Sequence, residues 1–307
     1  MTDDPIRGVV VPILTPLTPH ERVDTGSLRR LVAYLLDNGV HGIWAAGTTS
    51  EFAALSDDER NLSIETVVDE VRGRVPIIAN ISAPATGLAI ELGHAVKDLG
   101  LAGIAATPPF YFPSVQDELL DHFRYIQDSS DMPLWVYNIP STVKTVVEPA
   151  TVATLAEEGT VVGIKDSSGA GEPLAQLNLL CEQGDFELYR FIGTSHRIST
   201  ATSIGVHGVI PSIANLVPAA AASAWEAGDR GDTDAALEFQ SKVMVASSVT
   251  RLAAGGGPNA GTVSGMKSAL KIMGVIDHDS VTRPLRGLTQ EEKKGIPAVL
   301  EELGLSS

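Results

Sequence analysis

Short apolar segments alternate with longer amphipathic segments along most of the chain. The apolar segments have the length of strands, and most are bounded by Gly, Pro, Ser or Thr, as strands often are. They lie at residues 8–14, 42–46, 75–81, 103–107, 133–138, 161–165, 188–193 and 208–210. Between them apolar residues recur at helical spacing, as Leu28, Leu31 and Leu35 do. The pattern therefore predicts alternating strands and helices around a parallel sheet.

Helical patterns fill the gaps between the predicted strands, at residues 27–37, 57–72, 86–99, 115–129, 149–158, 173–182 and 216–227. The second pattern follows Ser56, with Glu59 three positions on. This spacing predicts a capping box, in which each side chain binds the backbone N–H of the other residue. Eight strand–helix units within about 230 residues favour a closed (β/α)8 TIM barrel over an open doubly wound sheet, which rarely needs eight regular units.

The strand pattern ends before residue 231. Helical patterns at 233–252, 263–273 and 290–303 follow, and the sequence GGGP at 255–258 separates the first two. We therefore predict a barrel over residues 1–230 and a C-terminal helical extension outside the barrel over residues 231–307.

Composition narrows the class of protein. Asp and Glu total 38 against 22 Lys and Arg, so the formal net charge is −16, and we expect no nucleic-acid partner because this field repels phosphate backbones. No apolar run reaches the roughly 18 residues of a membrane span, and no signal-peptide pattern opens the chain. The single cysteine, Cys181, cannot form an internal disulfide. We expect a cytoplasmic protein without a membrane span.

Lys165 ends the sixth apolar run, where a barrel of this kind places its chemistry. Side chains alternate across a strand, so Ile164 and Asp166 share the face opposite Lys165. If Ile164 faces the helices, Lys165 faces the lumen, where burial lowers the pKa of a lysine from about 10.4 toward neutrality. The neutral amine is a nucleophile that can form a Schiff base. The alternative is a lysine that reaches the rim and pairs with a carboxylate.

Tyr137 lies two residues after Trp135 in the fifth run, so the two side chains share a face. If that face is the lumen, Tyr137 stands on the strand next to Lys165, about 4.8 Å away across the sheet. Its phenol can then transfer protons during imine chemistry. The alternative is a tyrosine that packs at the barrel rim with its hydroxyl satisfied.

A hydroxyl-rich turn at residues 47–51, which includes Thr48 and Thr49, ends the second run. Its hydroxyls and backbone N–H groups can hold a carboxylate, although a simple loop before a helix has a similar composition. The seven histidines show no ligand spacing, and neither G-x-x-x-x-G-K-[ST] nor G-x-S-x-G occurs. We therefore expect no metal and no cofactor.

These segments together resemble the dihydrodipicolinate synthase / N-acetylneuraminate lyase family. The similar segments are GTTSE at 47–51, TPPFY at 107–111, YNIP at 137–140, GIKDSSG at 163–169, GVI at 208–210, AN at 214–215 and KSALK at 267–271. They span nearly the whole chain in the family's order. The resemblance implies a (β/α)8 barrel with a C-terminal helical extension. It also implies a homotetramer, a dimer of dimers, with class I aldolase chemistry on pyruvate or another small 2-oxo acid.

The resemblance assigns catalytic roles to individual residues. Lys165 would form the Schiff base, and Tyr137 would carry protons to and from it. Thr48 would link Tyr137 by hydrogen bonds to Tyr111, which in this family reaches in from the neighbouring subunit.

The resemblance also assigns substrate contacts. Thr48 and Thr49 would hold the carboxylate of the pyruvyl group, and the backbone carbonyl of Ile210 would lie near the same end. Thr142 stands where the synthase branch has an arginine for the carboxylate of aspartate semialdehyde, and residues 193–196 lack the acidic side chains of the sialic-acid branch. We therefore expect a pyruvate-dependent aldolase or lyase with another substrate, such as a 2-keto-3-deoxy sugar acid.

Other functions are compatible with the sequence. One is 4-hydroxy-tetrahydrodipicolinate synthase itself, and another is a dehydratase that acts on a deoxy sugar acid through the same imine. A phosphate-binding barrel isomerase would use the loops after the seventh and eighth strands, near Ser212. It would explain neither Lys165 nor Tyr137. A non-catalytic binding barrel would leave both of them without a role.

Overall fold

Eight parallel strands form a closed barrel in the computed structural model, which describes residues 6–306. The strands are β1 (Gly8–Pro12), β2 (Gly42–Ala45), β3 (Ile77–Asn80), β4 (Gly103–Ala106), β5 (Leu134–Asn138), β6 (Gly163–Asp166), β7 (Tyr189–Ile192) and β8 (Gly208–Val209). Each strand pairs with the next, and β8 pairs with β1. The predicted (β/α)8 barrel is confirmed.

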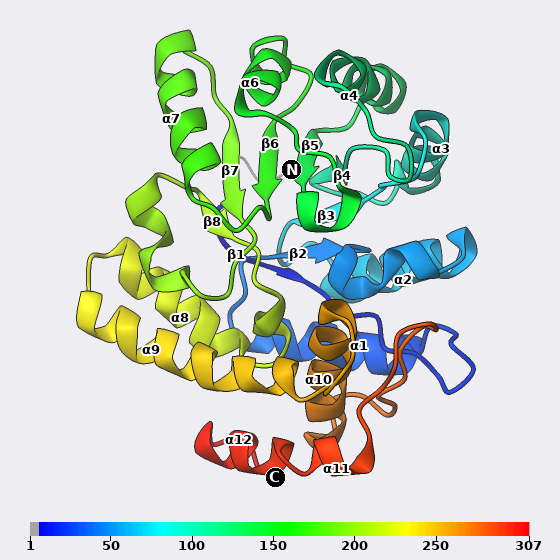
Figure 1. Ribbon diagram of the computed structural model, residues 1–307, viewed down its shortest axis with the longest axis vertical. Coiled ribbons are helices and arrows are strands. Elements are labelled where there is room, and N and C mark those ends of the chain that lie inside the picture. The colour runs from blue at the N-terminus through cyan, green and yellow to red at the C-terminus, as the bar shows by residue number, and fades with distance from the viewer. Residues whose placement is uncertain (1–5, 307) are drawn as a thin grey trace.

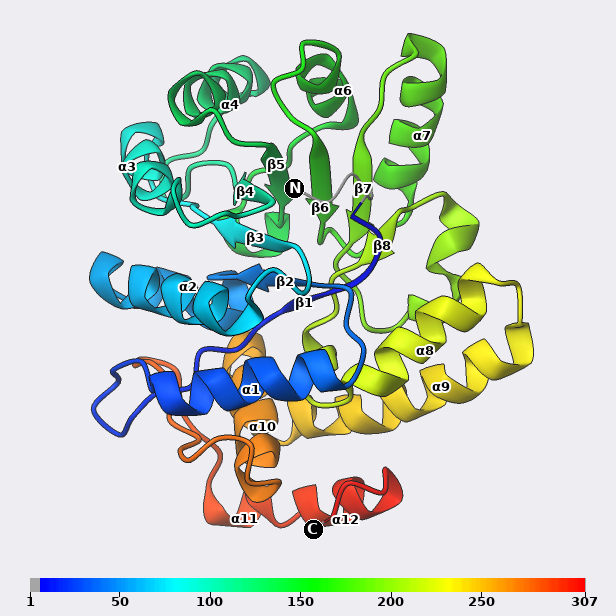
Figure 2. The ribbon, with the colours of Figure 1, turned by 180° about the vertical axis from the view of Figure 1, so that it is seen from behind.

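A ring of helices surrounds the strands (Figures 1 and 2). It consists of α1 (Thr25–Asp37), α2 (Asp57–Val71), α3 (Thr86–Val96), α4 (Gln116–Ser130), α6 (Pro149–Glu157), α7 (Glu172–Gly184) and α8 (Pro218–Asp229). The one-turn helix α5 (Pro140–Val143) follows β5 at the barrel mouth and has no counterpart among the predicted helices. None of the helices within residues 6–306 is long and apolar enough to cross a membrane.

The C-terminal helices are α9 (Thr233–Ala246), α10 (Pro258–Ile272), α11 (Gln290–Lys293) and α12 (Ile296–Glu302). Helix α9 runs along α8, and α11 and α12 lie at the edge of the molecule (Figures 1 and 2). Helix α10 contacts the short 3-10 helix Thr48–Ser50. The predicted extension therefore lies outside the strands but reaches the carboxyl end of the barrel.

Two local predictions need correction. Ser56 caps α2 as predicted, but the Glu59 carboxylate accepts a hydrogen bond of 2.5 Å from the backbone N–H of Val23 and pairs with Arg22, so no capping box forms. The segment 290–303 forms two short helices in place of one. The reason is Pro297, which cannot donate the hydrogen bond that a continuous helix requires at that position.

The barrel interior is filled by large side chains. Trp44 and Trp135 meet edge to face at 6.4 Å between ring centroids, and Phe191 lies 5.5 Å from Trp135. Gly163 makes room for this layer, because a Cβ there would lie 2.5 Å from the Trp135 ring. The interior is a packed core without a pore, and its aromatic layer forms the floor on which the side chains at the strand ends rest.

Candidate active site

Lys165 lies near the carboxyl end of β6 and points into the barrel. It is in register with Tyr137 on β5, and only 4% of the residue is exposed. Its Nζ atom lies 4.0 Å from the centroid of the Tyr137 ring and 4.8 Å from that of Trp44. The immediate neighbours of the amine are therefore aromatic faces, which attract a cation but do not neutralise it as a carboxylate would.

Burial lowers the pKa of the Lys165 amine below its usual value, because the charged form loses its hydration; the neighbouring Tyr137 opposes this shift. A larger fraction of the amine is then neutral at a given pH than in a solvated lysine. The neutral form is the nucleophile that attacks carbonyl carbon.

Tyr137 connects this amine to the turn after β2. Its hydroxyl lies 3.1 Å from Oγ1 of Thr48, and either oxygen can be the donor. Tyr137 is 2% exposed and packs edge to face against Trp44 at 5.5 Å. The phenol is therefore fixed between the amine and a hydroxyl that lies at the mouth of the barrel.

Hydrogen bonds of Ser50 fix the turn that carries Thr48 and Thr49. Ser50 is fully buried; its hydroxyl donates to the carbonyl of Ile13 at 2.5 Å and accepts from the N–H of Gly47 at 3.1 Å. These bonds fix the short 3-10 helix, and the side chains of Thr48 and Thr49 are left partly exposed at the mouth.

Asp166 supports the strand end from the opposite face. It is fully buried, and its carboxylate accepts hydrogen bonds from Asn138 at 2.7 Å and from Ser168 at 2.6 Å. Burial raises the pKa of Asp166, and the two hydrogen bonds counteract this shift. The bond to Asn138 ties β6 to β5, so the backbone on which Lys165 and Tyr137 stand is cross-linked.

Ile210 and Tyr111 occupy contrasting positions. Ile210 directly follows β8, is 3% exposed and belongs to the same interior cluster as Tyr137. Tyr111 is 88% exposed, has a left-handed backbone (φ 92°) and meets Phe112 edge to face at 5.1 Å between ring centroids. Within residues 6–306 it has no hydrogen bond to Thr48. A single chain therefore brings together Lys165, Tyr137 and Thr48 and leaves Tyr111 on the surface.

The model of the dihydrodipicolinate synthetase family matches residues 5–303. The chain belongs to this family. It is 33% identical over 300 residues to an uncharacterised DapA-like lyase of Halobacterium salinarum, covering 98% of this chain and 95% of that protein. It is 32% identical over 299 residues to 4-hydroxy-tetrahydrodipicolinate synthase of Pelobacter propionicus, covering 97% and 99%.

Solved structures of family members share the fold. The dihydrodipicolinate synthase of Acinetobacter baumannii, solved in complex with pyruvate, has a TM-score of 0.87 and 28% identity over 98% of this chain and 100% of that chain. Members of the family are class I lyases and aldolases, so this chain is an enzyme of that class, as the sequence predicted. Among residues 6–306, no three His, Cys, Asp or Glu side chains lie close enough together to hold a metal ion.

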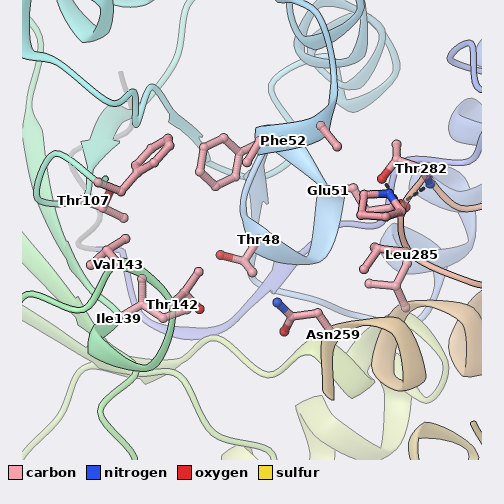
Figure 3. Close-up of a pocket in the computed structure, with 15 residues that line it drawn as sticks. Thr48, Glu51, Phe52, Thr107, Ile139, Thr142, Val143, Asn259, Thr282 and Leu285 are labelled. Atoms are coloured by element: carbon pink, nitrogen blue, oxygen red, sulfur yellow. Dashed lines mark hydrogen bonds between the residues drawn. The ribbon is translucent and has the colours of Figure 1, made fainter. Parts of the chain in front are cut away.

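A cavity of about 260 Å³ opens beside Thr48, between the barrel mouth and α10 (Figure 3). It is lined by Thr48, Glu51, Phe52, Ala53, Ala54, Thr107, Phe110, Ile139, Thr142, Val143, Asn259, Val263, Thr282, Pro284 and Leu285. Thr48, Thr142 and Asn259 point into the same space from three different elements (Figure 3). Sequence reasoning had singled out Thr48 and Thr142 but not Asn259.

One wall of the cavity depends on a buried ion pair that sequence reasoning missed. Nζ of Lys267 on α10 donates to Glu51 at 2.5 Å and to the carbonyl of Ser280 at 2.8 Å. The other carboxylate oxygen of Glu51 accepts from the N–H of Thr282 at 2.6 Å and from its hydroxyl at 2.8 Å. The two side chains of the pair are 1% exposed or less.

A signal for this pair was present in the sequence. Val263, Lys267 and Leu270 follow the i, i+4, i+7 spacing of one helix face, and all three are buried. A lysine within an apolar stripe requires a buried partner, because an unpaired buried charge is costly.

We predict that Lys267→Met lowers the free energy of unfolding by about 3–5 kcal/mol, because the substitution leaves the Glu51 carboxylate buried without its counter-charge. Chemical denaturation followed by circular dichroism measures the change. The matched control is Lys271→Met, one turn further along α10, where the lysine is 45% exposed and pairs with Asp279.

The control should cost less than about 1 kcal/mol, because a solvated ion pair contributes little. Adding Glu51→Gln to Lys267→Met should restore part of the lost stability, since the uncompensated charge disappears. If the Lys267 and Lys271 variants lose equal free energy of unfolding, the buried ion pair stabilises the protein no more than the exposed pair does.

Proposed function

We propose that Lys165 forms a Schiff base with the carbonyl of pyruvate or another 2-oxo acid, and that the enzyme makes or breaks the adjacent carbon–carbon bond. The observation that carries this proposal is the Lys165 amine, which lies among aromatic rings 4.0 Å from the Tyr137 ring centre. The Acinetobacter baumannii relative, solved in complex with pyruvate, supports the choice of substrate.

The imine supplies the electron sink that the reaction needs. The amine adds to the carbonyl carbon and water leaves, which gives a protonated imine. Loss of a proton from the neighbouring carbon then yields a neutral enamine, so no naked carbanion forms. Tyr137 would move these protons. Two distances support this role: its ring centre lies 4.0 Å from the amine, and its hydroxyl is 3.1 Å from Oγ1 of Thr48.

Substrate binding follows from the same geometry. In this proposal Thr48 and Thr49 hold the carboxylate of the pyruvyl group with the hydroxyls and N–H groups of their turn, which Ser50 fixes in place. The carbonyl of Ile210 would lie near the same end of the substrate.

We further propose that the enzyme is a homotetramer, a dimer of dimers, in which Tyr111 completes the site of a neighbouring subunit. Its 88% exposure in the single chain and its strained backbone support this role. Tyr111 would extend the hydrogen-bonded path from Tyr137 and Thr48 toward solvent.

A second candidate function is 4-hydroxy-tetrahydrodipicolinate synthase, which is the activity named for the Pelobacter propionicus relative. Thr142 disfavours it. This residue lines the cavity and offers a hydroxyl where the carboxylate of aspartate semialdehyde would need a guanidinium partner.

We predict that borohydride in the presence of pyruvate attaches a reduced pyruvyl group to Lys165 alone. Intact mass and peptide mapping detect the adduct. Lys165→Met provides the control, since it removes the amine but keeps an apolar side chain of similar length. An adduct on another lysine, or none on the wild-type enzyme, would refute the proposed function.

The rate of imine formation should rise with pH and reach its plateau at a lower pH than it would for a solvated lysine, whose pKa is about 10.4. The direction follows because the neutral amine is the nucleophile and burial lowers the pKa of Lys165. Rapid mixing with pyruvate and quenching with borohydride at a series of pH values measures this profile. A midpoint at or above that of free lysine would contradict the role of burial.

Tyr137→Phe should keep the pyruvyl adduct but reduce turnover by about 10²–10⁴-fold, the usual contribution of a general acid–base group. Thr48→Val tests the next position of the same path and should give a smaller loss. Turnover of Tyr137→Phe near the wild-type rate would show that the phenol serves only to pack the barrel rim.

A further inference from the structure

The cavity beside Thr48 lies where a second substrate would have to sit. Thr48 lines it, and the Thr48 hydroxyl is 3.1 Å from that of Tyr137, whose ring is 4.0 Å from the Lys165 amine. A molecule in the cavity therefore meets the enamine at the end where the proton-transfer groups lie. Resting on the proposed imine function, we infer that this cavity binds the acceptor aldehyde and that the acceptor is uncharged with a hydrocarbon tail.

The charges of the lining exclude an anionic acceptor. In the described part of the chain, the residues that line the cavity include no lysine, arginine or histidine. The lining residue that carries a charge is Glu51, and its carboxylate is already bound by Lys267 and Thr282. A carboxylate on the acceptor would lose part of its hydration without gaining a counter-charge, which disfavours its binding.

The hydroxyls of the lining argue against a polyhydroxylated acceptor. Thr48 is hydrogen-bonded to Tyr137, Thr107 donates to the carbonyl of Pro108, and the Thr282 hydroxyl donates to Glu51. Within residues 6–306, Thr142 and Asn259 are the lining side chains whose polar groups make no hydrogen bond. A sugar-derived aldehyde that extends into the cavity places hydroxyls against hydrocarbon side chains, where they find no hydrogen-bond partner.

The arrangement of the lining separates a polar end from an apolar one. Thr48, Thr142 and Asn259 point into one part of the space, while Phe52 and Leu285 lie on other sides of it (Figure 3). Thr48 marks the end toward the imine site, because its hydroxyl is 3.1 Å from that of Tyr137. The other side chains are mostly hydrocarbon: Ala53, Ala54, Phe110, Ile139, Val143, Val263 and Pro284. The acceptor carbonyl therefore fits at the polar end, and its tail fits against carbon.

The chemical step balances without a co-reactant. The enamine carbon attacks the aldehyde carbon, the π electrons of the carbonyl move to its oxygen, and that oxygen takes a proton by way of Tyr137. Water then hydrolyses the imine, which releases the Lys165 amine and a 4-hydroxy-2-oxo acid. The cleavage direction reverses these steps and consumes a 4-hydroxy-2-oxo acid with an apolar terminus.

Two pairs of aldehydes of matched chain length test the inference. With pyruvate, kcat/KM for propanal should exceed that for glyceraldehyde by about tenfold or more, because unsatisfied hydroxyls are penalised. For butanal against succinate semialdehyde the ratio should reach about a hundredfold, because a carboxylate costs more to bury. A preference for glyceraldehyde or for succinate semialdehyde would overturn the inference, as would failure to accept any of the four.

Substitutions in the lining test whether this cavity sets the preference among aldehydes. Thr142→Arg places a cation in the lining and should raise kcat/KM for succinate semialdehyde relative to butanal by about tenfold or more. Ser141→Arg is the matched control, since its side chain is exposed and does not line the cavity, and it should leave the ratio unchanged. Leu285→Asn should lower kcat/KM for butanal more than for propanal. Equal effects of the two arginine variants would place the acceptor elsewhere.

Borohydride trapping of pyruvate on each protein separates this inference from the proposed function. If Lys165 of the wild-type enzyme is not labelled, the imine function itself fails. If Lys165 is labelled but the order of aldehydes is reversed, only the assignment of the acceptor fails.

Discussion

The buried ion pair between Glu51 and Lys267 joins the turn after β2 to the C-terminal helices. Its atoms are 2.5 Å apart, and Ser280 and Thr282 satisfy the other polar groups of the pair. A buried charge pair is tolerated only with such complete hydrogen bonding. Through this pair, α10 and the segment at 280–285 become a wall of the cavity, and the turn that carries Thr48 gains an external support.

Two buried lysines in this enzyme show how surroundings decide chemistry. Lys267 has a carboxylate at hydrogen-bond distance and acts as a structural cation. Lys165 is also buried, with 4% of the residue exposed, but it lies against the rings of Trp44 and Tyr137. Burial lowers the pKa of both amines. The carboxylate compensates the charge of Lys267, whereas the rings leave the Lys165 amine as an available nucleophile.

The site divides into two parts with different tolerance to change. The proposed imine part is built on β5 and β6 and cross-linked by Asn138 and Asp166, so its geometry follows from the barrel. The proposed acceptor part is built from the turn after β2, the one-turn helix α5 and α10. A change at a position such as Thr142, which lies on one of these connecting elements, alters the chemistry of the cavity and leaves the strands unchanged. One fold can therefore keep the imine and change its acceptor.

The sequence by itself determined the strands and the helices of the barrel and showed that Tyr137 shares a face with Trp135, because periodicity and alternation are local properties of the chain. The structure decided that this face, and Lys165 beside it, point into the barrel. The sequence also predicted a helical extension that begins at residue 231. Only the tertiary structure decided that Glu59 binds Val23, that Lys267 pairs with Glu51, and that Thr142 and Asn259 share a cavity. These contacts join residues far apart in the chain, and their distances depend on how the helices pack against the barrel, which no local pattern encodes.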